Sequence, residues 1–185
     1  MRTGKDAVLL RLASAANNYG LTPNMMTALG LCLGVASGVM FMLRALPFAF
    51  AFGFLSVFCD VLDGTLARRF HMESRFGKAF DSVADRTTEA AVVMGALMGG
   101  IVEPAGLVAI VGSVSLLGFR TLSYARGFNT DYVWFGRAER LAFILMGLLS
   151  PVVPLSTACF VVAGGFGVVS SLQIAISLLR QRFKQ

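Results

Sequence analysis

The sequence contains six long apolar stretches, and this feature constrains the fold more than any other. They lie near residues 24–43, 46–69, 78–101, 104–126, 139–154 and 156–180. Several reach the ~20 apolar residues that a helix needs to cross the hydrocarbon core of a bilayer, and the fifth is the shortest. No stretch has the alternating pattern of a transmembrane strand, and backbone polar groups in lipid must be paired internally. We therefore expect an all-α membrane protein with six transmembrane helices.

The composition excludes several other classes of protein. Of the 185 residues, 56% are hydrophobic and only 14% are charged. A soluble two-layer domain or a disordered chain would need far more polar residues. The three cysteines, Cys32, Cys59 and Cys159, all lie in apolar stretches and lack the spacing of a metal or redox motif, so a disulfide scaffold is disfavoured as well. We expect one membrane domain over residues 1–185, without linkers.

The basic residues predict the orientation in the membrane. The net charge is +6, but the bases stand at the ends of apolar stretches, which is not the distribution of a nucleic-acid groove. Arg44 alone lies on one side of the six stretches, and the other fifteen bases lie on the opposite side, which the positive-inside rule makes cytoplasmic. Both termini are then cytoplasmic. Residues 1–20 form a juxtamembrane segment in which 6–19 fit a short amphipathic helix on the membrane surface.

Five acidic residues stand where they are costly, at the ends of two apolar stretches. Asp60 and Asp63 are three residues apart, and Asp81, Asp85 and Glu89 are four apart, so each set falls on one face of its helix. Both helices reach the same cytoplasmic loop, where the four aspartates would repel one another unless a cation lies between them. Oxygen ligands without nearby His or Cys favour Mg²⁺ or Mn²⁺, and four carboxylates could hold two ions.

Small and basic residues surround the acidic set. Gly64, Ala67 and Gly77 leave room beside the aspartates, either for close helix packing or for a flat ligand such as a nucleotide base. Arg68 and Arg69 follow directly, and a guanidinium beside a divalent ion suits a pyrophosphate. The joint pattern, D-x-x-D-G-x-x-A-R, eight residues, then G-x-x-x-D-x-x-x-D, fixes eight identities in the 26 positions from Asp60 to Asp85. Chance does not plausibly produce such a pattern.

This pattern resembles the signature of the CDP-alcohol phosphatidyltransferase family without a gap or substitution. Residues 21–27, Leu-Thr-Pro-Asn-Met-Met-Thr, also look like the family's T-P-N-x-x-T opening. The resemblance covers nearly the whole chain. It implies a dimeric enzyme of the cell membrane that transfers a phosphatidyl or archaetidyl group from a CDP-lipid, CDP-diacylglycerol or CDP-archaeol, to an alcohol with release of CMP. The catalytic pocket would open to the cytoplasm.

The resemblance also assigns roles by position. Asp60, Asp63 and Asp81 would bind the metal ions, and Asp85 would complete the metal site or act as the catalytic base on the acceptor hydroxyl. The CDP-lipid would be bound by residues of the signature and of the opening motif: Asp60, Gly64, Ala67, Arg68, Gly77, Asn24 and Thr27. No paired nucleophile such as Cys–His is present, so we expect direct in-line displacement at phosphorus.

The segment around the loop between the fourth and fifth apolar stretches bears on the identity of the acceptor. Residues 123–126, Ser-Tyr-Ala-Arg, resemble the S-Y-x-K/R segment of family members that use inositol phosphate, and residues 137–140, Arg-Ala-Glu-Arg, resemble their E-R-x-E-R segment. Arginines beside the site suit an acceptor that carries its own phosphate. We expect this phosphate to be bound by Ser123, Arg126, Arg137 and Arg140. The first choice of acceptor is inositol 1-phosphate and the second is glycerol 3-phosphate.

Two other classes of function remain open from the sequence. A small cation-coupled transporter would also place carboxylates and arginines in a helical pocket. Its mark would be a weak internal repeat with helices broken at mid-membrane, and no such repeat is visible. A catalytically silent assembly subunit is disfavoured because all eight signature positions are intact.

Overall fold

The structure is a computed structural model, and it describes residues 4–104, 106–125, 137–150 and 153–182. Within these residues the chain forms seven α-helices and no strand. The helices are α1 (Gly4–Asn18), α2 (Pro23–Met42), α3 (Leu46–Arg69), α4 (Arg75–Met98), α5 (Gly106–Ala125), α6 (Arg137–Leu149) and α7 (Val153–Arg182). The N-terminal segment and the six apolar stretches thus each correspond to one helix, which confirms the predicted all-α fold class.

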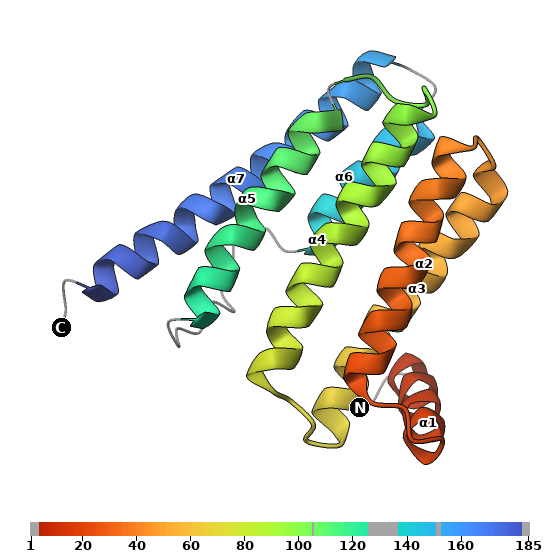
Figure 1. Ribbon diagram of the computed structural model, residues 1–185, viewed down its shortest axis with the longest axis vertical. Helices are drawn as coiled ribbons and strands as arrows, with labels where there is room; N and C mark the ends of the chain where they lie inside the picture. The colour runs from red at the N-terminus through yellow and green to blue at the C-terminus, as the bar shows by residue number, and fades with distance from the viewer. Residues whose placement is uncertain (1–3, 105, 126–136, 151–152, 183–185) are drawn as a thin grey trace.

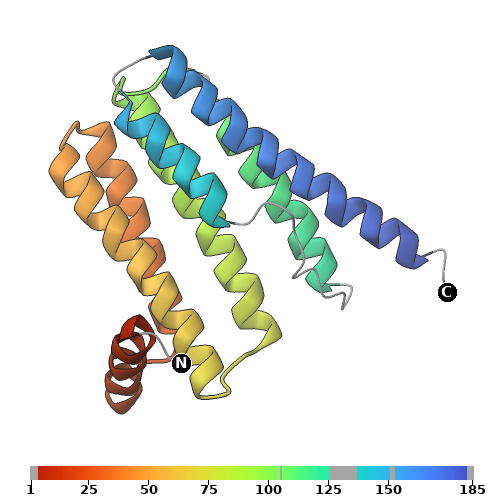
Figure 2. The ribbon, with the colours of Figure 1, turned by 180° about the vertical axis from the view of Figure 1, so that it is seen from behind.

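Helices α2 to α7 form an elongated bundle, and α1 crosses its axis at one end (Figure 1). Helix α2 packs against both α3 and α4, and α7 packs against both α5 and α6. Helix α4 joins the two groups through its contacts with α5 and, over a short length, with α6. At the end where α1 lies, α5 and α7 lean away from α4, as both Figure 1 and the opposite view in Figure 2 show.

Helix α1 is held to the bundle by a small apolar cluster. Ala13 is fully buried, and Leu9 and Ala16 pack with it against Leu62 and Leu66 of α3. Arg11 lies on the exposed side. The expected helix before the first apolar stretch is therefore present, with one apolar side packed against protein. Its position on a membrane surface remains a prediction.

Helices α2, α3 and α4 pack closely through small residues. Ser37 Oγ donates to the carbonyl of Ala49 at 2.7 Å, and Ser56 Oγ donates to the carbonyl of Gly30 at 2.7 Å, so two hydroxyls join α2 to α3. Between α2 and α4 the backbones touch: a Cβ added to Gly95 would lie 1.9 Å from the carbonyl oxygen of Gly38. This close approach fixes α4 relative to α2, and α4 carries three of the five acidic residues discussed below.

Three of the described helices are long and apolar enough to cross a bilayer: α2, α3 and the segment Pro154–Ser177 within α7. Large apolar side chains on α3, such as Phe54 and Phe58, are exposed and suit lipid. The other helices depart from the expectation for physical reasons. Helix α6 has 13 residues and is about 20 Å long, short of the ~30 Å hydrocarbon core. Helix α4 carries charges in its first half, and α5 has a shorter apolar segment, Gly106–Phe119. The chain is an integral membrane protein, and six complete spans remain a prediction.

Candidate active site

Three aspartates from two helices come together at the end of the bundle near α1. Asp60 and Asp63 lie near the C-terminal end of α3, and Asp81 lies in the second turn of α4. One carboxylate oxygen from each lies within 4.8 Å of the others. Asp85, one turn further along α4, lines a small cavity together with these three aspartates. The helices thus assemble the four aspartates that the sequence pattern singled out.

The cavity between these aspartates is small and polar. Its volume is about 10 Å³, and Thr27 and Ser56 line it together with the four carboxylates. This is the space that one water molecule or one ion requires. Oxygen donors with concentrated negative charge are the ligands that Mg²⁺ and Mn²⁺ prefer, so the donor set fits a divalent cation. Thr27 Oγ1 donates to Asp63 Oδ2 at 2.6 Å and orients this buried carboxylate.

A larger cavity of about 170 Å³ lies beside the aspartates. Its walls are the first turns of α2 and α4 and the last turns of α3, including Asn24, Ala67 and Arg68. Both α2 and α4 begin here with a capped N-terminus: Thr22 accepts from the backbone N–H of Met25, and Ser74 accepts from that of Gly77. Helix N-termini carry partial positive charge, so two of them with a guanidinium favour an anionic ligand. The cavity therefore suits a pyrophosphate next to a metal site.

Two glycines of the signature give this cavity its shape. A Cβ at Gly64 would lie 3.4 Å from the Arg68 guanidinium, and a Cβ at Gly77 would lie 3.1 Å from Oδ1 of Asn24. Both glycines and Asp63 line the cavity with Arg68. The structure thus brings the expected CDP-lipid residues, Asn24, Thr27, Gly64, Ala67, Arg68 and Gly77, to one place, with Asp60 in the adjoining small cavity.

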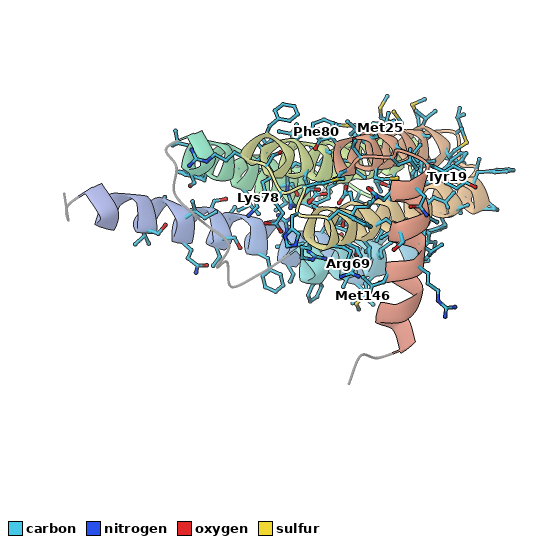
Figure 3. The ribbon with its side chains drawn as sticks, turned by 90° about the horizontal axis from the view of Figure 1, so that it is seen from below. Tyr19, Met25, Arg69, Lys78, Phe80 and Met146 are labelled. Atoms are coloured by element: carbon cyan, nitrogen blue, oxygen red, sulfur yellow. The ribbon has the colours of Figure 1, made fainter. Side chains whose placement is uncertain are left out.

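Basic residues surround the entrance to this site. Arg68 and Arg69 stand in the last turn of α3, and Lys78 stands in the first turn of α4. Figure 3 views the bundle from this end and shows Arg69 at the end of α3 and Lys78 at the start of α4. Both side chains are exposed, and Lys78 lines the larger cavity. Their charge favours the approach of an anionic substrate.

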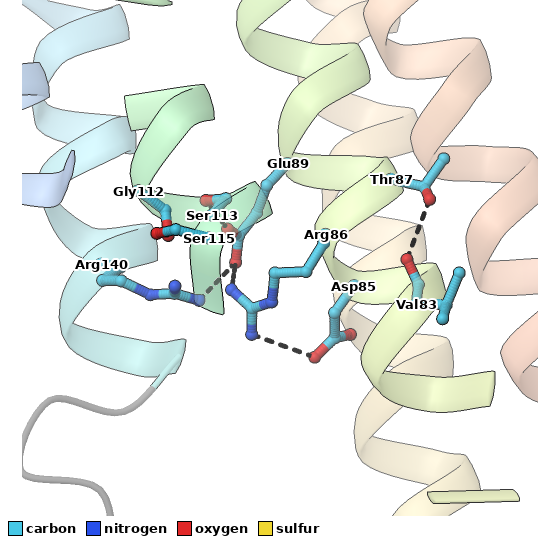
Figure 4. A network of polar contacts seen from close by, with 9 residues as sticks. All are labelled: Val83, Asp85, Arg86, Thr87, Glu89, Gly112, Ser113, Ser115 and Arg140. Carbon is cyan, nitrogen blue, oxygen red and sulfur yellow. Dashed lines mark hydrogen bonds and ion pairs between the residues drawn. The ribbon is translucent and has the colours of Figure 1, made fainter. Parts of the chain in front are cut away.

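The fifth acidic residue, Glu89, belongs to a different group of contacts (Figure 4). Its carboxylate accepts hydrogen bonds from Arg86 Nη1 at 2.7 Å, from Ser113 Oγ of α5 at 2.5 Å and from Arg140 Nη2 of α6 at 3.1 Å. Arg86 Nη2 also lies 3.7 Å from Asp85 Oδ2. The roles of Arg86 and Ser113 were missed by the sequence reasoning. The spacing of three between Arg86 and Glu89 on one helix was the available signal.

The expected acceptor residues are only partly described by the structure. Ser123 is fully buried, and its hydroxyl donates to the carbonyl of Phe119 at 2.9 Å. The hydroxyl oxygen can still accept a hydrogen bond from another donor. Arg140 is buried and paired with Glu89. Arg126 lies outside the described residues. Arg137 is the first residue of α6, and its side chain lies outside the description.

Comparison with known proteins agrees with this geometry. The family model for CDP-alcohol phosphatidyltransferase matches residues 20–178. Among curated proteins, the archaetidylinositol phosphate synthase of Pyrococcus horikoshii is 29% identical over 143 residues, which cover 76% of this chain and 76% of that protein.

Solved structures give the same relationship. The crystal structure of phosphatidylinositol phosphate synthase from Mycobacterium tuberculosis with CDP-DAG bound is similar with a TM-score of 0.74 and 25% identity, and the match covers 91% of this chain and 92% of that one. A second crystal structure of that protein, in complex with manganese and citrate, matches with a TM-score of 0.73 and 25% identity over 92% of this chain and 88% of that one. The family match disfavours the transporter alternative. The residues of the intact signature line the two adjoining cavities. The chain belongs to the CDP-alcohol phosphatidyltransferase family, the membrane enzymes that transfer a phosphatidyl group from a CDP-linked donor.

Proposed function

We propose that this enzyme transfers a phosphatidyl or archaetidyl group from a CDP-lipid to inositol 1-phosphate and releases CMP. The observation that carries the proposal is the position of four aspartates around one ion-sized cavity, next to a larger cavity that contains Arg68 and two helix N-termini. The similar mycobacterial enzyme has been crystallised with CDP-DAG, and the similar archaeal protein is an archaetidylinositol phosphate synthase.

The residues divide the work in a way that follows from their positions. Asp60, Asp63, Asp81 and Asp85 would hold one or two Mg²⁺ or Mn²⁺ ions, which when bound neutralise the pyrophosphate and the leaving CMP. Arg68 and the first turns of α2 and α4 bind and orient the pyrophosphate in the larger cavity.

Asp85 is the proposed base, because it lines the small cavity, is buried and lies beside Arg86. It accepts the proton of the acceptor hydroxyl as that oxygen attacks the phosphorus of the phosphatidyl group. The bond from this phosphorus to the pyrophosphate bridging oxygen breaks, and CMP leaves.

The acceptor is proposed to enter from the side of α5 and α6. Ser123 and Arg140 lie on these helices, and Arg126 and Arg137 belong to the same part of the sequence. Several guanidinium groups suit an acceptor with its own phosphate better than a neutral alcohol. Glycerol 3-phosphate carries a phosphate too and is the second candidate.

We further propose that α2 to α7 all cross the cell membrane and that residues 1–185 form one domain with cytoplasmic termini. Positive charge supports this orientation, since Arg68, Arg69 and Lys78 stand at the same end of the bundle as α1, whereas Arg44 stands at the opposite end. A homodimer is proposed from the family resemblance.

The test of the proposed activity is CMP release by the purified protein in detergent with a CDP-lipid and Mg²⁺. Inositol 1-phosphate, free inositol, glycerol 3-phosphate and serine are supplied in separate reactions. We expect release with inositol 1-phosphate. Release with glycerol 3-phosphate alone would replace the acceptor and keep the enzyme class, and release with none of the four would contradict both acceptor candidates.

Two variants test the aspartates. Asp81→Asn and Asp85→Asn keep the side-chain volume and remove one negative charge each, so both should abolish CMP release while the protein remains folded. Glu103→Gln is the matched control, because this exposed carboxylate lies between α4 and α5 at the opposite end of the bundle. Substantial activity in both aspartate variants would contradict the proposed metal site.

A further inference from the structure

Glu89 is a buried carboxylate that joins three helices. It lies in the middle of α4, is 3% exposed, and accepts hydrogen bonds from α4, α5 and α6 through Arg86, Ser113 and Arg140 (Figure 4). Ser113 uses Oε2, whereas both arginines use Oε1. Both oxygens of the carboxylate are therefore engaged, and the positions of two guanidinium groups depend on one of them.

The buried arginines of this group outnumber the carboxylates left to pair with them when Asp85 is assigned to the aspartate site. Arg86 and Arg140 are 2% and 1% exposed and share the single carboxylate of Glu89. The second carboxylate in reach of Arg86 is that of Asp85, at 3.7 Å. In the proposed function Asp85 serves the metal ions and the acceptor proton. Among the described residues, two buried guanidinium groups then stand against one carboxylate, and this surplus positive charge favours an anion beside them.

The hydrogen-bond donors of the two arginines give the same indication. Among the described residues, Nε and Nη1 of Arg140 and Nε of Arg86 are buried without a hydrogen-bond partner. Buried donors on a charged group are costly unless an acceptor satisfies them. Arg140 lies on α6, the helix that begins with Arg137, which is also expected to bind the acceptor's phosphate.

We propose that Glu89 is a positioning residue for the phosphorylated acceptor: it holds the guanidinium group of Arg86 next to Asp85 and fixes that of Arg140, so that Arg140 offers its free donors to the acceptor's phosphate. The inference rests on the proposed function, in which the acceptor carries a phosphate. Glu89 touches neither the substrates nor the metal ions. It acts through the two arginines, and through Arg86 it connects the acceptor side to the proposed base.

A purely structural ion pair would look similar, and kinetics separate the two roles. Glu89→Gln keeps the volume and the two hydrogen-bonding positions but removes the charge that holds the arginines. We expect the KM for inositol 1-phosphate to rise at least tenfold in this variant, while the KM for the CDP-lipid stays within twofold of wild type. A structural role would instead lower the melting temperature and affect both substrates or neither.

Binding of the acceptor alone gives a second readout that does not depend on turnover. Inositol 1-phosphate should raise the melting temperature of the wild-type protein in detergent, and this shift should disappear in Glu89→Gln, whereas the shift caused by CDP-lipid with Mg²⁺ should persist. Glu103→Gln, on an exposed carboxylate far from the group, should keep both shifts.

Ser113→Ala keeps the proposal testable if Glu89→Gln does not fold. It removes the hydrogen bond to Oε2 and leaves both ion pairs, so the KM for the acceptor should rise by a smaller factor, about threefold, with the donor KM unchanged. An unchanged acceptor KM in both variants would overturn the role of Glu89, and so would equal losses for both substrates. Failure of the proposed function is seen separately, as absence of CMP release by the wild-type protein with inositol 1-phosphate.

Discussion

The contact between Gly38 and Gly95 offers a quantitative test of how helix packing supports the aspartate site. A Cβ at Gly95 would lie 1.9 Å from the carbonyl oxygen of Gly38 and 2.6 Å from its carbonyl carbon. Ordinary van der Waals contact begins at about 3.4 Å, so Gly95→Ala is short of room by about 1.5 Å. Both atoms belong to the backbone, so no side-chain rotation can relieve the overlap, and α4 must move away from α2.

This movement should affect both stability and catalysis. Overpacking of this kind costs about 1–3 kcal/mol of unfolding free energy. Asp81 and Asp85 lie on the same helix, whereas Asp60 and Asp63 lie on α3, which packs on α2. A shift of about 1 Å in the aspartates of α4 relative to those of α3 is enough to lower the rate about 100-fold.

The assay compares Gly95→Ala with Gly165→Ala, because a Cβ at Gly165 of α7 meets nothing within 4 Å. Alanine there should be neutral or stabilise the helix by up to about 1 kcal/mol. Thermal unfolding in detergent, followed by circular dichroism, and CMP release are measured on both variants. If Gly95→Ala has the same melting temperature and the same rate of CMP release as Gly165→Ala, the argument that this contact positions the aspartates is refuted.

Three further predictions concern the site itself. Thr27→Val removes the hydroxyl that donates to Asp63 at 2.6 Å. A hydrogen bond to a charged group contributes about 1.5–3 kcal/mol, so kcat/KM should fall at least tenfold. Thr27→Ser should restore most of this loss, and a fully active valine variant would contradict the role of the hydroxyl. Arg68→Ala should raise the KM for the CDP-lipid about tenfold or more, as expected for a charged contact to phosphate. Arg69→Ala removes an exposed charge outside the cavity lining and should raise this KM by a clearly smaller factor, so equal effects of the two variants would refute the assignment. Removal of divalent ions with a chelator should stop CMP release, and Mg²⁺ or Mn²⁺ should restore it, so that activity surviving chelation would argue against a metal site at the aspartates.

Much of the fold and of the aspartate site could be predicted from the sequence for simple geometric reasons. Residues three or four apart share a helix face, so the spacing of Asp60 with Asp63 and of Asp81 with Asp85 places each pair on one side of its helix. The loop between α3 and α4 is short, which makes the two helices neighbours at this end. Proline also marks helix boundaries: Pro23 stands in the first turn of α2, and α6 ends at Leu149, before Pro151.

Glu89 shows where the same reasoning stops. A spacing of four predicts that Glu89 shares the face of Asp81 and Asp85, but an α-helix turns about 100° per residue, so eight residues after Asp81 the side chain has rotated by about 80°. This rotation turns Glu89 from α3 toward α5 and α6. Its partners, Ser113 and Arg140, are 24 and 51 residues away in the chain, and a local pattern carries no information about such distant contacts.

The three-residue spacing of Arg86 and Glu89 also matters while the chain is being made. The two charges lie on the same helix and pair at 2.7 Å, so this contact needs no residue of a later helix. A ribosome adds about 5–20 residues per second, so the 51 residues to Arg140 take about 3–10 s to appear. If α4 enters the membrane as proposed, it can do so during this interval with Arg86 and Glu89 paired, whereas an isolated charge costs about 2.5–3.5 kcal/mol at mid-membrane. In that case the order of the residues lets an internal salt bridge lower the cost of inserting α4, and Arg140 joins Glu89 only when α6 has been synthesised.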